Sequence, residues 1–260
     1  DAVQVYKGLD IGSAKVTEEE KEGIPHHLLD FKEVTEEYTI YHYQKDCREK
    51  IKDIQSRNKT PILVGGTGLY IKAALYDYKL SEEKSTNTYD NLTNEELYEE
   101  LKKLDKDIII DKDNRRRLIR AINYYKENNE SINKNKTNKL LYNVIFIGLT
   151  TDRQVLYDKI NKRVDEMISQ GLLEEVKSFY DKGIKSKPLL NAIGYRELYN
   201  YLDGNGTKEE AIEKIKQNSR HYAKRQYTFF NHQLPVVWFE TDYNNFNNTI
   251  EKVASYIDSN

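Results

Sequence analysis

One stretch of the chain, Ile62–Lys72, constrains the fold more than any other. Pro61 precedes a short uncharged apolar run, and three glycines with Thr67 follow before apolar residues recur at helical spacing. Such a run predicts a strand buried on both faces, so the stretch predicts a strand, a tight turn and a helix. Free backbone N–H groups and the positive end of a helix dipole then meet at the turn, which suits an anion such as a phosphate.

The same glycines are equally consistent with a plain sharp turn, because glycine adopts backbone angles that other residues avoid. No Gly-Lys-Ser or Gly-Lys-Thr closes the stretch, so it is not a Walker A phosphate loop. On these residues alone, an anion site and a purely structural turn both stay open for Gly65–Gly68.

Helices and strands alternate through much of the sequence. We expect a helix over Thr39–Arg57 and a buried strand over Val144–Leu149. A long helix begins near Asp152, and Pro235–Phe239 predicts a last strand before a terminal helix that reaches Ile257. This alternation predicts an α/β fold with a parallel sheet, in which ligands bind at the carboxyl ends of strands.

The N-terminal segment carries weaker signals. Ala2–Tyr6 predicts either an edge strand or an ordered loop. Thr17 and the three glutamates after it predict a helix start, and Ile24–Phe31 predicts a short strand. Because the chain begins at Asp1 rather than at methionine, we expect a fragment or a processed product.

Composition excludes several classes of protein. The formal net charge of -2 over 260 residues argues neither for nor against a nucleic-acid partner. Cys47 is the only cysteine, which excludes a zinc site built on thiolates, and the five histidines lack metal-ligand spacing, so we name no metal-binding residue. No apolar run approaches the ~18 residues of a membrane span, so we expect no membrane partner and a cytoplasmic location.

Residues 81–135 differ in composition from their surroundings. Acidic residues dominate up to Asp113, and a basic helix with Arg116, Arg117 and Arg120 follows. Arg116 and Arg120 are four residues apart and share a helix face. That face is either a solvated surface paired with the acidic segment or a contact to a phosphate backbone, and for an isolated run the solvated surface is favoured.

A second cationic cluster lies near the C-terminus. The helix that contains Arg220 also carries Lys224, Arg225 and Gln226, and aromatic residues follow them. Cations among aromatic side chains are typical of RNA-contacting surfaces, and also of a helix with one solvated and one buried side. Arg163, on an earlier helix, lies at the edge of the buried face, where its side chain can reach a cleft.

Six segments together resemble the tRNA dimethylallyltransferase family, also called the IPP transferases. ILVGGTGLYIKA resembles the family element GGT-x-LY, and DAVQVYKGLDIGSAK resembles D-S-x-Q-V-Y-x-G-x-D-I-G-T-A-K. Further family elements resemble IPHHLLD, INKRVDEMISQGLLEEV, AIGYRE and YAKRQYTFF, in family order from Asp1 to about Trp238. Six matches in order are far more specific than any one of them.

The resemblance implies a P-loop-NTPase-like parallel sheet flanked by helices, a fold common among ATP- and nucleotide-binding proteins, with a small helical insertion domain. The catalytic core would be residues 1–80 and 136–260, and the insertion would be residues 81–135. The implied reaction moves a dimethylallyl group from dimethylallyl pyrophosphate to N6 of adenosine 37, next to the tRNA anticodon, and releases pyrophosphate. The implied protein is a bacterial, cytoplasmic monomer.

The resemblance also implies roles for individual residues. Asp1 would be the carboxylate base near N6, since an aromatic exocyclic amine is a poor nucleophile. Thr67 and Arg163 would act with Asp1 in catalysis. The pyrophosphate would be bound by Gly65, Gly66, Thr67 and Arg163, with Mg²⁺ bridging its oxygens.

The implied tRNA-binding residues come from the N-terminal segment, the glycine turn, the basic helix of the insertion and two C-terminal segments. They are Asp1, Ala2, Val3, Gln4, Thr67, Arg116, Arg117, Arg120, Gly194, Tyr195, Arg196, Arg220, Lys224, Arg225 and Gln226. They would hold the tRNA anticodon stem-loop while the target adenine leaves the base stack. The resemblance therefore favours an RNA contact over a merely solvated surface for both cationic clusters.

The sequence departs from the family pattern in several places. The family's phosphate loop, G-P-T-x-x-G-K-T, is expected some residues before Asp1 and is not in this sequence, so we expect the chain as given to be inactive or nearly so. Ala2 replaces the usual serine. No arginine occurs between Arg57 and Arg115, although an early arginine of the insertion usually contacts tRNA in the family, so we expect weaker tRNA binding.

Three alternatives to a tRNA-modifying enzyme are considered. An adenylate isopentenyltransferase would prenylate a free nucleotide, although such a substrate needs neither the insertion nor the C-terminal cationic helix. A tRNA-binding protein without catalysis is consistent with the missing phosphate loop. A nucleotide kinase would share the P-loop-like fold.

Overall fold

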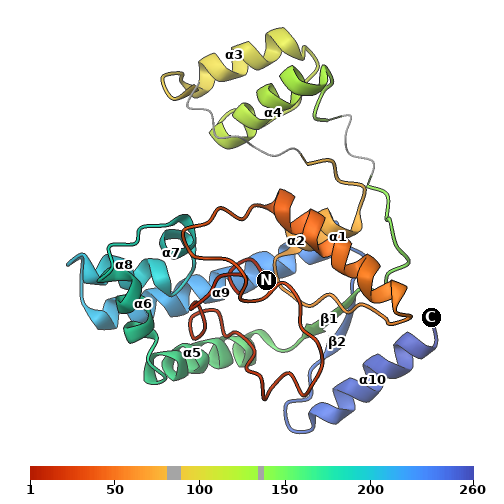
Figure 1. The fold of residues 1–260 in the computed structure, drawn as a ribbon, viewed down its shortest axis with the longest axis vertical. Coiled ribbons are helices and arrows are strands. Elements are labelled where there is room, and N and C mark those ends of the chain that lie inside the picture. Colours follow the sequence, from red (N-terminus) through yellow and green to blue (C-terminus); the bar gives the residue numbers. More distant parts are fainter. Residues whose placement is uncertain (81–88, 134–137) are drawn as a thin grey trace. The chain divides into compact units, whose positions relative to one another are not determined.

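A computed structural model of the chain describes residues 1–80, 89–133 and 138–260. Within these residues, helices make up most of the regular structure (Figure 1). The helices are α1 (Ile40–Ser56), α2 (Gly68–Leu75), α3 (Asn94–Leu104), α4 (Arg115–Asn128), α5 (Arg153–Ser169), α6 (Leu172–Tyr180), α7 (Lys187–Asn191), α8 (Tyr195–Leu202), α9 (Lys208–Gln233) and α10 (Phe246–Asp258). The strands are β1 (Ile147–Thr150) and β2 (Val237–Glu240). None of these helices is long and apolar enough to cross a membrane.

The chain divides into two compact units. The first contains Asp1–Tyr38, Glu49–Ile71 and Val144–Asn260, and the second contains Thr39–Arg48 and Lys72–Asn143. Helices α3 and α4, which lie within the predicted insertion, belong to the second unit. Both predicted ends of the insertion, at positions 81 and 135, fall outside the described residues.

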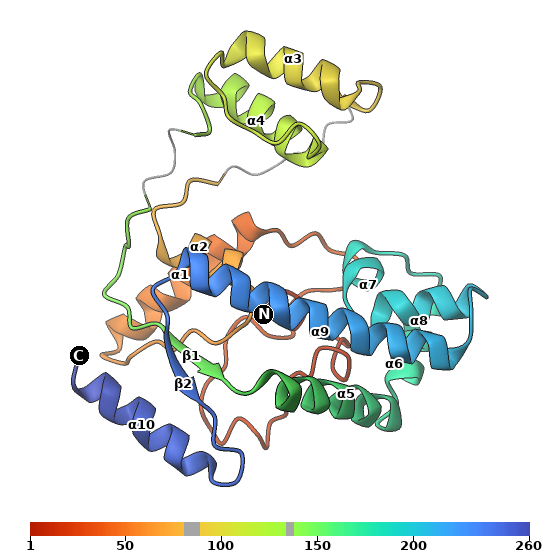
Figure 2. The ribbon, with the colours of Figure 1, turned by 180° about the vertical axis from the view of Figure 1, so that it is seen from behind.

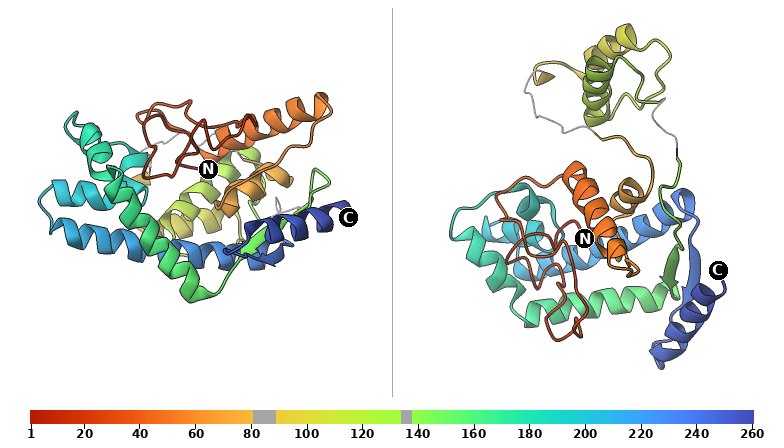
Figure 3. Two further views of the ribbon diagram at one scale, coloured as in Figure 1. Left: turned by 90° about the horizontal axis from the view of Figure 1, so that it is seen from below. Right: turned by 45° about the vertical axis from the view of Figure 1, so that its right-hand side comes forward.

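Strands β1 and β2 form a parallel pair. Ile147 faces Val237 and Thr150 faces Glu240 in their register. Parallel strands need a long crossover connection, and helices α5 to α9 supply it here (Figure 2). The C-terminal helix α10 packs on β2 (Figure 3). The structure therefore confirms an α/β fold with a small parallel sheet.

The strand predicted before the glycine turn is wrong. Ile62 and Val64 are 84% and 80% exposed, and their segment has no strand structure. A parallel strand exists only where a neighbour shares its backbone hydrogen bonds, and neither of the described strands pairs with this run. The strand predicted over Val144–Leu149 is present but shorter, and it is not buried on both faces because Leu149 is 48% exposed.

The helix predicted after Thr17 is also wrong, although its cap is present. Thr17 Oγ1 accepts from the Glu20 N–H at 3.2 Å, and Glu20 Oε2 accepts from the Thr17 N–H at 2.9 Å. This reciprocal pair is the arrangement of a capping box. Only a turn follows, because Gly23 takes a left-handed conformation with φ of 74° directly before the Ile24–Pro25 pair.

The short strand predicted over Ile24–Phe31 is absent for a similar reason. Leu28 and Asp30 have φ values of 60° and 57°, which extended backbone does not allow. A single parallel bridge joins Tyr6 to Lys32. For Ala2–Tyr6, the structure therefore selects the ordered loop over the edge strand.

Capping and an apolar interior fix the long helices of the first unit. Asp152 Oδ1 accepts from the N–H groups of Gln154 (2.8 Å) and Val155 (3.2 Å) at the start of α5. Thr207 and Glu210 form a capping box at the start of α9. Helix α9 packs against α5 and α8, and α6 packs against α8 (Figures 1 and 2). Buried side chains of these helices include Leu172, Val176, Leu198, Tyr199 and Ile215.

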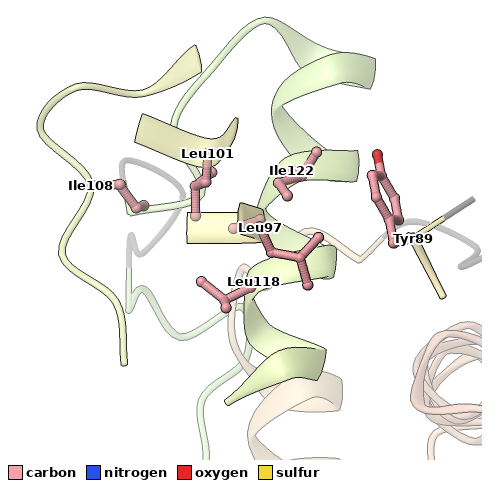
Figure 4. Packing of buried hydrophobic residues seen from close by; sticks show 7 residues of the cluster. Tyr89, Leu97, Leu101, Ile108, Leu118 and Ile122 are labelled. Carbon is pink, nitrogen blue, oxygen red and sulfur yellow. The ribbon is translucent and has the colours of Figure 1, made fainter. Parts of the chain in front are cut away.

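In the second unit, α3 and α4 pack around one apolar cluster (Figure 4). Its buried residues are Tyr89, Leu97, Leu101, Ile108, Leu118, Ala121 and Ile122. Leu97 and Leu101 are four apart on α3, as Leu118 and Ile122 are on α4, so each helix contributes one apolar stripe. The structure confirms the basic helix that the sequence predicts here, as α4.

We expect Leu97→Ala to lower the free energy of local unfolding of the α3–α4 pair by about 2–5 kcal/mol, because Leu97 is fully buried and its loss leaves a cavity. Amide hydrogen exchange of the whole chain measures this in α3 and α4. Ile109→Ala is the control, since Ile109 is 87% exposed in the same unit. Equal exchange in the two variants would contradict the packing.

Candidate active site

The glycine turn lies directly before α2, as predicted. The Thr67 carbonyl accepts hydrogen bonds from the N–H groups of Tyr70 (2.9 Å) and Ile71 (3.2 Å), so the first turn of α2 closes on Thr67. The Gly68 N–H donates to the Gly66 carbonyl at 3.1 Å. The turn therefore stands at the positive end of the helix dipole, the position that favours an anion.

Two glycines of the turn lie against α9. A Cβ on Gly66 would lie 1.7 Å from Nε2 of Gln226, and a Cβ on Gly68 would lie 2.2 Å from the ring of Phe229. Any larger residue at these positions would have to push side chains of α9 aside. Glycine thus lets side chains of α9 lie directly against the backbone of the turn and is not needed for an unusual backbone angle.

Thr67 meets the same helix through Tyr222. The Thr67 hydroxyl oxygen lies 3.4 Å from the hydroxyl oxygen of Tyr222, and the Tyr222 ring lies 5.7 Å from Cζ of Arg225. Tyr222, Gln226 and Phe229 follow at spacings of four and three, so they share one face of α9. The sequence prediction omits Tyr222, although its spacing from Gln226 is a signal that could have found it.

The cations of α9 that we predict to contact tRNA differ in their surroundings. Arg220 is half-buried and donates from Nη1 to Oδ1 of Asn161 on α5. Lys224 and Arg225 are exposed. Lys224 and Arg225 therefore present their charge to solvent on the helix that meets the glycine turn, whereas Arg220 also ties α9 to α5.

The N-terminal candidates form one hydrogen-bonded loop. Asp1 is exposed, and its Oδ1 accepts from the N–H groups of Val3 (2.7 Å) and Gln4 (3.4 Å). The Gln4 side chain donates from Nε2 to the carbonyls of Ser13 (2.9 Å) and Ala14 (3.0 Å). The local bonds orient the Asp1 carboxylate, and the Gln4 amide holds the loop closed.

The side chain of Tyr195 is not on the surface, and its predicted contact with tRNA stays a prediction. Tyr195 is fully buried, and its hydroxyl donates to Oε1 of Glu175 at 2.5 Å. It is buried because α8 packs against α6. Its neighbour Arg196 keeps a 43% exposed side chain, paired with Glu197, and Gly194 has a left-handed φ of 95°.

Arg163 and the arginines of α4 differ in their exposure to solvent. Arg163 is exposed on α5, and no hydrogen bond or ion pair among the described residues joins it to the glycine turn. Arg116 and Arg117 are exposed on α4, whereas Arg120 is half-buried. Arg115, next to them, instead binds the carbonyls of Tyr89 and Leu92 inside the second unit. The roles of these arginines toward pyrophosphate and tRNA stay predictions.

We expect Gly68→Ala to destabilise the first unit by about 1–3 kcal/mol, because the added methyl group overlaps the ring of Phe229. Gly65→Ala is the matched control, since a Cβ there meets no atom within 4 Å. Denaturant unfolding of both variants measures the difference. Equal stability would mean that the turn and α9 do not pack as described.

Comparison with known proteins agrees with the family resemblance of the sequence motifs. A family model described as IPP transferase matches residues 4–233. The tRNA dimethylallyltransferase of Anoxybacillus flavithermus is 48% identical over 268 residues, which cover 99% of this chain and 86% of that protein. The match therefore spans nearly the whole chain rather than one motif.

Solved structures agree with the sequence comparison. The tRNA isopentenylpyrophosphate transferase of Bacillus halodurans is 40% identical with a TM-score of 0.75, over 100% of this chain and 86% of that chain. A eukaryotic dimethylallyltransferase acting on tRNA is 26% identical with a TM-score of 0.85, over 98% of this chain and 69% of that chain. The chain belongs to the IPP transferase family.

Proposed function

We propose that this chain transfers a dimethylallyl group from dimethylallyl pyrophosphate to N6 of the adenosine next to the anticodon of tRNA. The observation that carries this proposal is the contact between the glycine turn and α9. Gly66 lies against Gln226, and Thr67 lies 3.4 Å from Tyr222. The element expected to bind the donor and the helix expected to bind RNA thus meet at one place, as transfer between the two substrates requires.

The reaction forms one bond and breaks one. The N6 nitrogen attacks C1 of the dimethylallyl group, the C1–O bond breaks, and pyrophosphate leaves with the bonding electrons. N6 then gives up one proton, and the proposed acceptor is the Asp1 carboxylate. Two local N–H donors hold one oxygen of this carboxylate, which fixes its direction. A fixed base needs no reorientation as the proton moves.

The pyrophosphate is proposed to sit at the start of α2, where charge develops on the leaving group. The positive end of the helix, the backbone of Gly65 and Gly66 and the Thr67 hydroxyl would stabilise that charge. Arg163 would join them from α5 with its exposed guanidinium. These groups act on the leaving group rather than on the attacking adenine.

Mg²⁺ is proposed to enter with the pyrophosphate. Among the described residues, no group of three His, Cys, Asp or Glu side chains could hold a metal ion. This fits an ion that takes most of its ligands from phosphate oxygens and water, as Mg²⁺ does in phosphate sites. The Thr67 hydroxyl is the side-chain oxygen of the turn that could reach it, and the ion would supply positive charge to the leaving group.

We also propose that the tRNA anticodon stem-loop binds a monomer of this protein in the cytoplasm of a bacterium. Lys224 and Arg225 on α9, with Arg116 and Arg117 on α4, would meet phosphates. The target adenine would leave its base stack, which would bring its N6 amine beside Asp1. The parallel β1–β2 pair and the glycine turn before a helix support a P-loop-like sheet as the scaffold.

Mass spectrometry of tRNA tests the proposal. After incubation with a protein that carries a family phosphate loop ahead of Asp1, Mg²⁺ and dimethylallyl pyrophosphate, we expect one added dimethylallyl group on the anticodon-loop adenosine, whereas the chain as given should add little or none. Prenylation of free AMP instead would favour the adenylate enzyme. Unmodified tRNA that nevertheless binds would favour a binding protein without catalysis, and phosphate transfer from ATP to a nucleotide would favour a kinase. Each of these outcomes would overturn the proposed reaction.

We expect Thr67→Ala to lower kcat by about 10- to 1,000-fold, the usual effect of removing one preorganised donor from a developing charge. The dissociation constant for tRNA should stay nearly unchanged, because the hydroxyl is proposed to act on the leaving group. Thr60→Ala, at an exposed threonine shortly before the turn, is the control. A parallel loss of tRNA binding would assign Thr67 a structural role instead.

A further inference from the structure

A single carboxylate, that of Glu175 on α6, gathers the backbone of the N-terminal loop. Its Oε2 accepts from the N–H groups of Asp10 (3.0 Å) and Ile11 (2.7 Å), and its Oε1 accepts from the N–H of Gly12 (3.2 Å). Oε1 also accepts from the Tyr195 hydroxyl at 2.5 Å. Three consecutive amides on one carboxylate form a strong, charge-assisted anchor.

The surroundings of Glu175 are shaped for this anchor. A Cβ on Gly12 would lie 2.5 Å from the ring of Tyr195, so only glycine lets the loop approach closely enough for its N–H to bond. Tyr195 is fully buried. Burial, together with the neighbouring Glu175 carboxylate, raises the pKa of the Tyr195 hydroxyl far above its usual range, so this group stays protonated and donates.

The anchored loop continues directly to the proposed base. The carbonyls of Ser13 and Ala14, just after the anchored amides, accept the Gln4 side chain. The Gln4 N–H in turn donates to Oδ1 of Asp1. Residues 1–38 contain no helix and only one bridge, so hydrogen bonds of this kind hold the segment in place. A shift of the loop at Gly12 would therefore move Asp1.

We propose that Glu175 is a positioning residue of the transfer reaction, which anchors the loop that carries Asp1 to α6. This inference rests on the proposed function. Glu175 contacts neither substrate in this scheme and acts through the loop. Its removal should lower the rate of transfer while donor binding, which uses the glycine turn, stays intact.

Glu175→Gln tests the anchor, because a glutamine keeps the size but cannot accept from all four donors. Glu174→Gln is the matched control, since Glu174 is exposed on the same helix. We expect Glu175→Gln to speed amide exchange at residues 10–12 and to lower kcat by at least about tenfold. The KM for dimethylallyl pyrophosphate should stay within about twofold of the parent value, and Glu174→Gln should match the parent.

Tyr195→Phe provides a second variant if Glu175→Gln does not fold. It removes one donor and keeps the three amide bonds, so we expect faster exchange at residues 10–12 and a smaller fall in kcat. Unchanged exchange at residues 10–12 in the folded variants would overturn the anchor. Changed exchange with parent-like kcat would overturn the positioning role. The parent for the kcat and KM measurements carries a family phosphate loop ahead of Asp1. If that parent is inactive, the proposed function and with it the positioning role are overturned, while the exchange data still decide the anchor.

Discussion

The contact on which the candidate site depends is the close approach of the glycine turn to α9. Because Gly66 and Gly68 have no side chains, the side chains of Gln226 and Phe229 lie directly against their backbone. This brings together two motifs that are far apart in the sequence. The start of α2, with its favourable potential for an anion, and the cationic, aromatic surface of α9 thereby become one region of the first unit.

The N-terminal segment follows a different principle, because it is held by polar side chains rather than by regular structure. The Glu175 carboxylate accepts hydrogen bonds from three consecutive backbone N–H groups of the loop. The Lys15 ammonium instead donates to oxygen atoms of the same segment. The Lys15 side chain is 8% exposed, and its ammonium donates to the Tyr6 carbonyl and pairs with Asp10 and Asp30. Each of these groups is satisfied by several partners, which is the condition for burying part of an ionic group without a large penalty.

Helices could be predicted from the sequence because their signals are local. Asp152 and Thr207 mark helix starts by capping, and apolar spacing of three and four marks the faces of α1, α3 and α4. The absence of a strand at Ile62–Val64 could not be predicted in this way, since a strand depends on a distant partner that its own residues do not specify. The capping pair Thr17–Glu20 shows the same limit, because a helix start does not ensure a helix.

For the site, the sequence identified the glycine turn and the cationic helices but not their partners. The burial of Tyr195 and the contact of Tyr222 with Thr67 both depend on which helix faces meet, and periodicity leaves that open. Glu175 carries no motif signal that separates it from the exposed Glu174 beside it. Its role follows only from the three amides that the fold brings to it.

The most direct test of this account is a crystal structure of the chain with pyrophosphate and an anticodon stem-loop. We predict pyrophosphate at the backbone of Gly65–Gly68 and the Thr67 hydroxyl, with the anticodon-loop adenine between Asp1 and the Tyr222–Gln226 face of α9. Pyrophosphate bound away from the glycine turn, or RNA bound away from α9, would contradict the central claim that these two elements form one active site.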